Sequence, residues 1–158
     1  MKTLDFTGLK TAGAQKVVTE LQQLLADFQI FYTNLRGFHW NIKGPGFFTL
    51  HSKFEQMYDD TAEKVDEIAE RILMLDGVPA HTFTDYLKLA KVKETGYVSC
   101  ETECIKNILE TYSCFLAQER KIIEIAEEIN DEATVALMSD YIKEQEKLVW
   151  MLVAYSSK

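Results

Sequence analysis

Apolar residues recur every three or four positions along most of the chain, which is the spacing of one face of an α-helix. Nowhere do they alternate with the period of two that marks a half-buried strand. Gly-Pro-Gly at 44–46 and Gly-Val-Pro at 77–79 interrupt the pattern, because these residues suit turns and not helix interiors. The pattern therefore predicts an all-α protein with four long helices, at about residues 11–38, 47–76, 97–129 and 131–154, the third starting near Tyr97 or Glu101.

The connections between these segments predict how the helices are arranged. Helices of this length would each be about 40 Å long. Two of the connections are short turns, whereas residues 80–94 form a longer connector with a helical patch at 84–90. We expect a single domain over residues 1–158, a four-helix bundle with a short extra helix in the crossover between its second and third helices. Residues 1–10 are expected to form a short N-terminal tail, and Asp131 is a candidate N-cap of the fourth helix.

Charge and cysteine content narrow the class of protein. The formal net charge is −8, which disfavours contact with nucleic acid and anionic membranes and attracts cations. No apolar run is long enough for a signal peptide or a membrane span. Three cysteines, without a C-x-x-C pair, fit a reducing compartment better than a disulfide framework. We expect a cytoplasmic protein.

The second predicted helix has two different faces. Its predicted core face consists of Phe54, Met57, Tyr58, Val65, Ile68, Ile72 and Leu75. The opposite face carries Glu55, Asp59, Glu63, Asp66 and Glu70. Such a stripe is tolerable in water, but burial against a partner would need a cation to offset the repulsion. Both interpretations, a solvated face and a cation site, remain open from this helix alone.

Two histidines favour the cation site. His39 ends the first helix and His51 lies in the first turn of the second, so an antiparallel hairpin closed at residues 44–46 places both imidazoles at one end of the bundle. Each histidine alone could be structural. Together with Asp66 and Glu70 they form a ligand set suited to Fe(II), with Zn(II) or Mn(II) as alternatives.

Helix length prevents one chain from completing this site. Asp66 and Glu70 follow His51 by about 22 and 28 Å along a continuous helix. A two-fold dimer with antiparallel second helices would bring His39 and His51 of one subunit to the two acids of the other, and it would generate two equivalent sites. An ordinary di-iron centre inside one bundle uses Glu-x-x-His motifs. None is present, because the residues three before the histidines are Arg36, Phe48 and Val78.

The chain resembles the Dps family of mini-ferritins, the DNA-binding proteins from starved cells. The resemblance covers essentially the whole chain and is most specific at His39-Trp40-Asn41, His51 and the D-x-x-x-E-R of residues 66–71. It implies a ferritin-like bundle and an iron-oxidising centre made by His39 and His51 with Asp66 and Glu70 of the dimer mate.

The resemblance also suggests roles for neighbouring residues. Glu55 stands where the family more often has aspartate, and it is a further candidate metal ligand. Trp40 matches a tryptophan beside the centre that can take up an oxidising equivalent, or it is a buried interface aromatic. Arg71 is expected to pair with carboxylates rather than touch iron.

Family members form hollow dodecamers with tetrahedral symmetry, built from two-fold dimers, and store ferric mineral inside. The resemblance implies Fe(II) oxidation with hydrogen peroxide, and protection from oxidative damage. Glu128, Asp131 and Glu132 are candidate pore residues or a solvated turn. The alternative function, DNA compaction with secondary iron binding, has weak support because the terminal lysines are only Lys2, Lys10 and Lys158.

The remaining candidates have simpler interpretations. Cys100, Cys104 and Cys114 share one helical stripe, as a thiolate site or as small residues in a helix contact, and we favour the contact. Cys104 and Cys114 lie about 15 Å apart along the axis, too far to share a metal. His81 is predicted to be a loop residue. Met57, Met74, Met138 and Met151 are predicted to fill gaps in the core.

Overall fold

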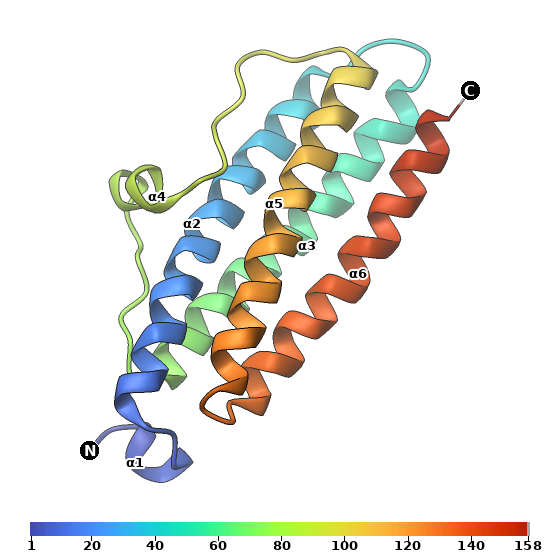
Figure 1. Ribbon diagram of the computed structural model, residues 1–158. Coiled ribbons are helices and arrows are strands. Elements are labelled where there is room, and N and C mark those ends of the chain that lie inside the picture. Colours follow the sequence, from blue (N-terminus) through green and yellow to red (C-terminus); the bar gives the residue numbers. More distant parts are fainter. Residues whose placement is uncertain (158) are drawn as a thin grey trace.

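The computed structural model describes residues 1–157; Lys158, considered above as a terminal lysine for DNA contact, lies outside them. The described chain is helical without a strand, and its four long helices lie side by side (Figure 1). This confirms the all-α prediction. The helices are α1 (Leu4–Thr7), α2 (Thr11–Asn41), α3 (Phe47–Met74), α4 (Phe83–Leu89), α5 (Glu101–Glu127) and α6 (Glu132–Ser156).

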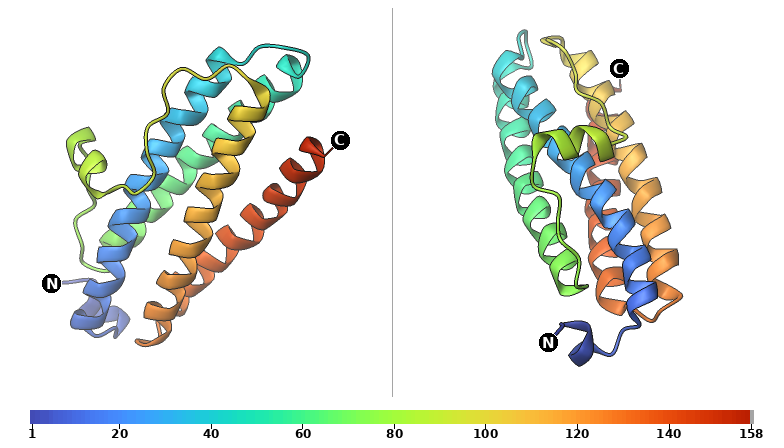
Figure 2. Two further views of the ribbon diagram at one scale, coloured as in Figure 1. Left: turned by 45° about the horizontal axis from the view of Figure 1, so that its top comes forward. Right: turned by 90° about the vertical axis from the view of Figure 1, so that its left-hand side faces the viewer.

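The chain passes along the bundle four times, with one crossover. The helices α2 and α3 form an antiparallel hairpin, and α5 and α6 form another. The connector that carries α4 joins the two hairpins and runs back along the outer side of α2 (Figures 1 and 2). The predicted crossover and its short helix are therefore confirmed. Between residues 1 and 157 no helix combines the length and apolarity needed to cross a lipid bilayer.

Aromatic residues pack the centre of the bundle. Phe28 of α2 stacks on Phe115 of α5, with ring centroids 4.2 Å apart. Phe31 meets the edges of Phe115 and Tyr112 at 5.2 and 5.3 Å. Each fully buried phenylalanine stabilises the fold by about 1.5–3 kcal/mol relative to an exposed one. These contacts attach the second hairpin to the first.

Polar side chains of α2 hold the crossover in place. They satisfy backbone groups of the connector, which would otherwise lie against the bundle without partners. The buried Asp27 carboxylate accepts from the N–H groups of Lys91 and Val92 at 2.6 and 2.8 Å. Asn34 donates to the carbonyl of Lys93 at 2.9 Å and accepts from the N–H of Thr95 at 3.0 Å. Gln22 binds the carbonyl of Val78 and the N–H of Ala80 at 2.6 and 2.9 Å.

The turn at residues 44–46 needs a glycine at its first position. Gly44 has φ of 109°, a conformation that side chains with a Cβ rarely adopt. The ends of the Glu101 and Tyr155 side chains pack against Gly46 from α5 and α6. The turn that brings the two histidine-bearing helix ends together is thereby fixed in position.

The structure corrects some predicted boundaries. The helix α2 continues past Phe38 to Asn41, and α3 ends at Met74. The first ten residues are not entirely a tail, because α1 lies within them and its Leu4 is buried. Asp76 accepts hydrogen bonds from the N–H groups of Thr3 and Leu4 at 2.8 and 3.1 Å, which attaches this segment to the end of α3.

Two of the four methionines assigned to the core are not in it. Met57 and Met138 are buried as predicted. Met74 and Met151 are 47 % and 44 % exposed in the subunit, so the prediction is wrong for them. Met74 is the last residue of α3, and Met151 lines an open groove between α3 and α6 together with Gln56. Helical periodicity marks their face correctly, but no helix covers that face at these positions.

Candidate metal centre

The two histidines meet at one end of the α2–α3 hairpin, as their sequence positions predict. Their rings stack with centroids 3.8 Å apart and an interplanar angle of 18°. His39 Nδ1 lies 2.7 Å from the carbonyl oxygen of His51, and His51 Nδ1 lies 2.8 Å from the carbonyl oxygen of His39. Each ring thus binds the backbone of the other residue.

These reciprocal hydrogen bonds determine the tautomer of both rings. A carbonyl oxygen only accepts, so each Nδ1 must carry a proton and donate it. In a neutral imidazole the lone pair is then on Nε2, the arrangement in which a histidine is ready to bind a metal. Within residues 1–157 neither Nε2 has a hydrogen-bond partner.

Aromatic neighbours fix the two rings. Phe47 lies nearly parallel to His51, with centroids 5.0 Å apart, and Tyr58 meets His39 edge-on at 5.4 Å. His39 is buried and His51 is half-buried. The imidazole pair is therefore a rigid, partly accessible feature of the bundle end.

The predicted acidic partners are not at this end. Asp66 and Glu70 are exposed on α3, which is unbroken from Phe47 to Met74, so they lie several turns from His51. Among residues 1–157, no three histidine, cysteine, aspartate or glutamate side chains lie close enough together to hold a metal ion. The single chain brings His39 and His51 together but leaves both acids apart from them.

Glu55 and Trp40 lie close to the histidines along the chain and both are exposed. Glu55 is one turn beyond His51 on α3. Trp40 is 64 % exposed, and the guanidinium of Arg36 lies 4.6 Å from the centre of its ring. The subunit alone therefore does not bury Trp40, and its indole is available to a partner surface.

Arg71 turns away from the acidic stripe. Its guanidinium forms an ion pair of 2.6 Å with Asp131, and its Nε donates to the hydroxyl of Thr134 at 2.8 Å. The expectation that Arg71 pairs with a carboxylate is confirmed. Asp131 also accepts from the N–H and the hydroxyl of Thr134, at 3.1 and 2.6 Å, which confirms it as the N-cap of α6.

The same contacts correct one candidate pore residue. Asp131 is buried, and its two oxygens are occupied by Arg71 and Thr134, so it is not presented to a pore. Glu128 and Glu132 are exposed at the α5–α6 turn, and the expectation for them stays a prediction. His81 is exposed in the connector, as predicted.

The cysteines differ from one another in environment. Cys104 is buried, and burial raises the pKa of its thiol to about 11. Because the thiolate is the reactive and metal-binding form, this favours the packing role over a redox role for Cys104. Cys100 and Cys114 are exposed, so the packing prediction does not hold for them.

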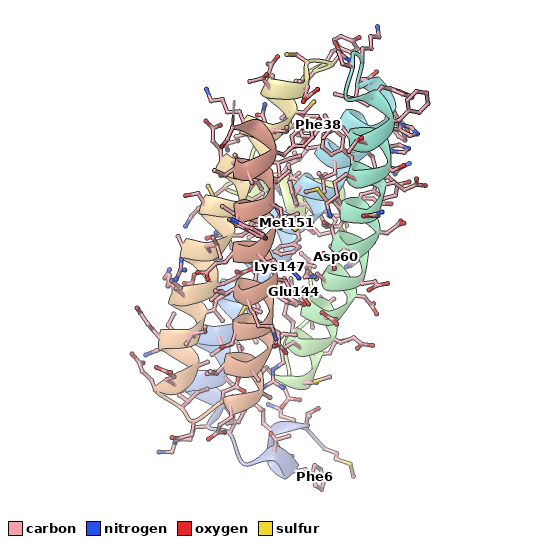
Figure 3. The ribbon with its side chains drawn as sticks, turned by 90° about the vertical axis from the view of Figure 1, so that its right-hand side faces the viewer. Phe6, Phe38, Asp60, Glu144, Lys147 and Met151 are labelled. Carbon is pink, nitrogen blue, oxygen red and sulfur yellow. The ribbon has the colours of Figure 1, made fainter. Side chains whose placement is uncertain are left out.

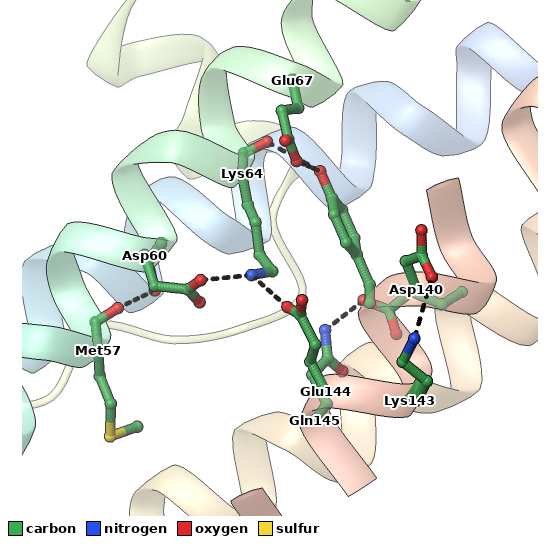
Figure 4. Close-up of polar contacts among 11 residues, drawn as sticks. Met57, Asp60, Lys64, Glu67, Asp140, Lys143, Glu144 and Gln145 are labelled. Atoms are coloured by element: carbon green, nitrogen blue, oxygen red, sulfur yellow. Dashed lines mark hydrogen bonds and ion pairs between the residues drawn. The ribbon is translucent and has the colours of Figure 1, made fainter. Parts of the chain in front are cut away.

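A polar cluster inside the bundle was missed by the sequence interpretation. The ammonium of Lys64 lies 2.6 Å from a carboxylate oxygen of Asp60 and 2.8 Å from one of Glu144, which connects α3 to α6 (Figures 3 and 4). Tyr141 donates to Glu67 at 2.6 Å beside it. The sequence interpretation did not single out Lys64, and the structure buries it.

Glu119 is the second missed residue. It is fully buried on α5, accepts a hydrogen bond from Gln145 at 2.5 Å, and has its pKa raised to about 7 by burial. The sequence contains a sign that Glu119 is buried. It occupies the helical repeat of the core residues Tyr112, Phe115 and Ile122, where a carboxylate is unusual.

Comparison with known proteins identifies the family. The Ferritin family, described as a ferritin-like domain, matches residues 18–158. The chain is 52 % identical over 157 residues to the DNA protection during starvation protein of Porphyromonas gingivalis, with 99 % of each chain covered. It is 39 % identical to DNA protection during starvation protein 2 of Bacillus anthracis, with 89 % of this chain and 97 % of that protein covered.

A solved structure gives the same result. The Dps protein of Vibrio cholerae O1 superposes with a TM-score of 0.94 at 49 % identity, with 96 % of each chain covered. The chain belongs to the Dps family. The ferritin-like fold predicted from the Dps resemblance is therefore confirmed, and the Vibrio protein is described as a member of a broad superfamily of ferritin-like diiron-carboxylate proteins.

Proposed function

We propose that this Dps-family chain oxidises Fe(II), preferably with hydrogen peroxide, at sites shared between two subunits, and stores the resulting Fe(III) as mineral inside a hollow dodecamer. The observation that carries the proposal is the His39–His51 pair, whose mutual hydrogen bonds leave both Nε2 atoms ready for a metal. Iron is the substrate of this ferroxidase.

The exposed acids complete the proposed site. Asp66 and Glu70 face away from the core of their own subunit. In a two-fold dimer with α3 helices packed antiparallel, they meet the histidines of the partner subunit. Two imidazoles and two carboxylates suit Fe(II), with Glu55 as a further oxygen ligand. Trp40, exposed beside His39, is covered by the same contact and supports the site from its edge.

The reaction needs the site to bind Fe(II) and to hold it while electrons leave. Each ferrous ion gives up one electron, and peroxide takes two electrons with two protons to become water. The carboxylates favour the more highly charged Fe(III), because hard oxygen ligands with negative charge stabilise it. The product then moves to acidic residues of the cavity, and the removal of Fe(II) and peroxide protects the cell from oxidative damage.

The relatives' names speak of DNA protection, and the residues before α2 carry few positive charges for contact with DNA. The first residues are attached to Asp76 through hydrogen bonds from Thr3 and Leu4. Only Lys2 and Lys10 lie before α2. We propose that DNA is protected through iron chemistry, with direct compaction as the alternative that a gel shift at low salt with metal-free protein would reveal.

Replacing a histidine tests the ferroxidase activity. His51→Ala removes one ligand and the ring stacked on His39, so the rate of peroxide-dependent Fe(II) oxidation should fall by about 100-fold. His81→Ala is the matched control, since His81 is an exposed connector residue and its replacement should leave the rate unchanged. The rate is followed by absorbance of ferric product on protein of known oligomeric state. An undiminished rate in His51→Ala would reject the site.

Mixing two inactive variants tests the sharing between subunits. In a heterodimer of His51→Ala and Asp66→Asn subunits, one site carries both substitutions and the other carries neither. Co-assembly should therefore restore about a quarter of wild-type activity, because about half the dimers are mixed and each contains one intact site. Restoration fails if each subunit builds its own site, and in that case the inter-subunit arrangement is wrong.

A further inference from the structure

The contact between α3 and α6 contains a second arrangement of charged groups, separate from the histidine pair, in which Lys64 is buried and the Asp60 and Glu144 side chains are 55 % and 58 % exposed. Asp60, Thr61 and Lys64 of α3 face Glu144 and Gln145 of α6 (Figure 4). Together they line a cavity of about 30 Å³ between the helices, which is closed on the α2 side by Phe28 and Phe31. The lining is mainly apolar, and a cavity of this size has room for one water molecule beside the polar groups of α3 and α6.

The Lys64 ammonium lies where a bound cation would lie. Carboxylate oxygens approach it from two facing helices, Asp60 at 2.6 Å and Glu144 at 2.8 Å. The Lys64 side chain is only 9 % exposed, so its charge is removed from water and depends on these two partners. The two carboxylates carry one more negative charge than the single ammonium neutralises.

Two unpartnered oxygens lie beside this pair. Glu119 Oε2 and Gln145 Oε1 are buried without a hydrogen-bond donor among the described residues, while their other side-chain atoms bind each other. Gln145 Oε1 is an acceptor, and Glu119 Oε2 is one when its carboxyl is ionised, above its pKa of about 7. Buried acceptors that lack donors require a donor or a cation. The interior therefore has more oxygen ligands than its own lysine uses.

Four-helix bundles of the ferritin-like class hold metal ions between facing helices, on carboxylates. We propose that the Lys64 ammonium occupies a divalent-cation site between α3 and α6 of this chain and keeps metal out of it. If this site stays closed to metal, Fe(II) goes to the proposed site between subunits, and this consequence rests on the proposed function. Without Lys64, Asp60 and Glu144 have two negative charges for a hard divalent ion, with Gln145 as a neutral oxygen ligand.

The test is to remove the ammonium and offer Mn(II), a hard ion with oxygen preference. Lys64→Gln is made in a His51→Ala background, so that binding at the histidine pair does not obscure the result. We expect about one additional Mn(II) per chain by equilibrium dialysis, and a thermal midpoint raised by about 5 °C in Mn(II) over that in EDTA. Lys53→Gln in the same background is the matched control, being on the same helix but outside the Asp60–Glu144 pair, and should show neither effect.

Every outcome bears on the proposal. Addition of Glu144→Gln must abolish the extra Mn(II), since it removes one of the two carboxylates. If Lys64→Gln does not fold in EDTA, refolding in Mn(II) must recover it. Absence of extra Mn(II), failure to refold in either condition, or binding that survives Glu144→Gln would overturn the proposal. None of these readouts uses iron oxidation, so they stand apart from the test of His51.

Discussion

The helix α3 carries carboxylates with two different environments. Asp60 pairs with the buried ammonium of Lys64 at 2.6 Å, whereas Asp66 and Glu70, within three turns on the same helix, have no cation within hydrogen-bonding distance among the described residues. At its C-terminal end α3 supplies Arg71 to the buried Asp131. We call Asp60 and Asp131, which are paired with cations of the chain, the inward acids, and the unpaired Asp66 and Glu70 the outward acids.

This difference separates structural acids from functional ones. Like charges stacked at i,i+4 cost a few tenths of a kcal/mol per pair in water, so an unpaired stripe is affordable only while it is solvated or bound to cations. A buried carboxylate costs far more unless it is paired. The inward acids should therefore respond to mutation through stability, and the outward acids through iron oxidation.

The largest expected effect on stability is at Arg71. Arg71→Ala leaves the buried Asp131 without its cation and should lower the free energy of unfolding by about 3 kcal/mol. Arg120→Ala is the matched control, since Arg120 pairs with Glu146 at the same 2.6 Å but at the surface, and should cost about 0.5 kcal/mol. Denaturant unfolding at equal protein concentration measures both. Equal losses would show that burial does not distinguish the two pairs.

Glu119 should make stability depend on pH. Its pKa is raised from 4.5 to about 7 in the folded state, so the folded state binds a proton more tightly than the unfolded chain does. The free energy of unfolding is therefore highest below about pH 4.5 and falls as pH rises to about 7, by about 3 kcal/mol in total.

Glu119→Gln removes this dependence. It should stabilise the protein by about 3 kcal/mol at pH 8 and leave it nearly unchanged at pH 4.5, because glutamine stays neutral at both values. Its amide can also donate to the unpartnered Oε1 of Gln145. Unfolding curves at the two pH values provide the measurement, and a variant that retains the wild-type slope would assign the pH dependence to another group.

Substitutions of the exposed acids of α3 should change the rate of iron oxidation rather than stability. Asp66→Asn should slow peroxide-dependent iron oxidation by about 100-fold, with a change in unfolding free energy below about 0.5 kcal/mol, because the side chain is exposed in the subunit. Glu55→Gln should slow it only about threefold, as an accessory oxygen ligand. Stopped-flow absorbance gives the rates. A larger loss at Glu55 than at Asp66 would reverse their assigned roles.

Much of the fold follows from the sequence. The Gly-Pro-Gly at 44–46 predicts the α2–α3 hairpin, and the hairpin in turn predicts that His39 and His51 meet, as they do at 3.8 Å between ring centroids. Asp131 was recognisable as an N-cap because an aspartate at a helix start satisfies free N–H groups. These features depend on local chemistry and on one turn.

Features that depend on packing between distant segments could not be predicted from the sequence. The burial of Lys64 requires Glu144 from another helix, 80 residues along the chain, to neutralise it. The exposure of Met74 and Met151 depends on where neighbouring helices end. The Asp66–Glu70 half of the proposed site cannot be read from a single subunit, because in the proposed dimer the groups that face it belong to a second copy.

The mutual hydrogen bonds of His39 and His51 have a consequence for affinity. Each ring is held by the backbone of the other residue, at 2.7 and 2.8 Å, so neither has to find its rotamer when an ion arrives. The entropic cost of preorganisation is met once, during folding, and does not reduce the binding free energy. Loosening one imidazole also loosens the other, so in the proposed site the two histidines are preorganised together.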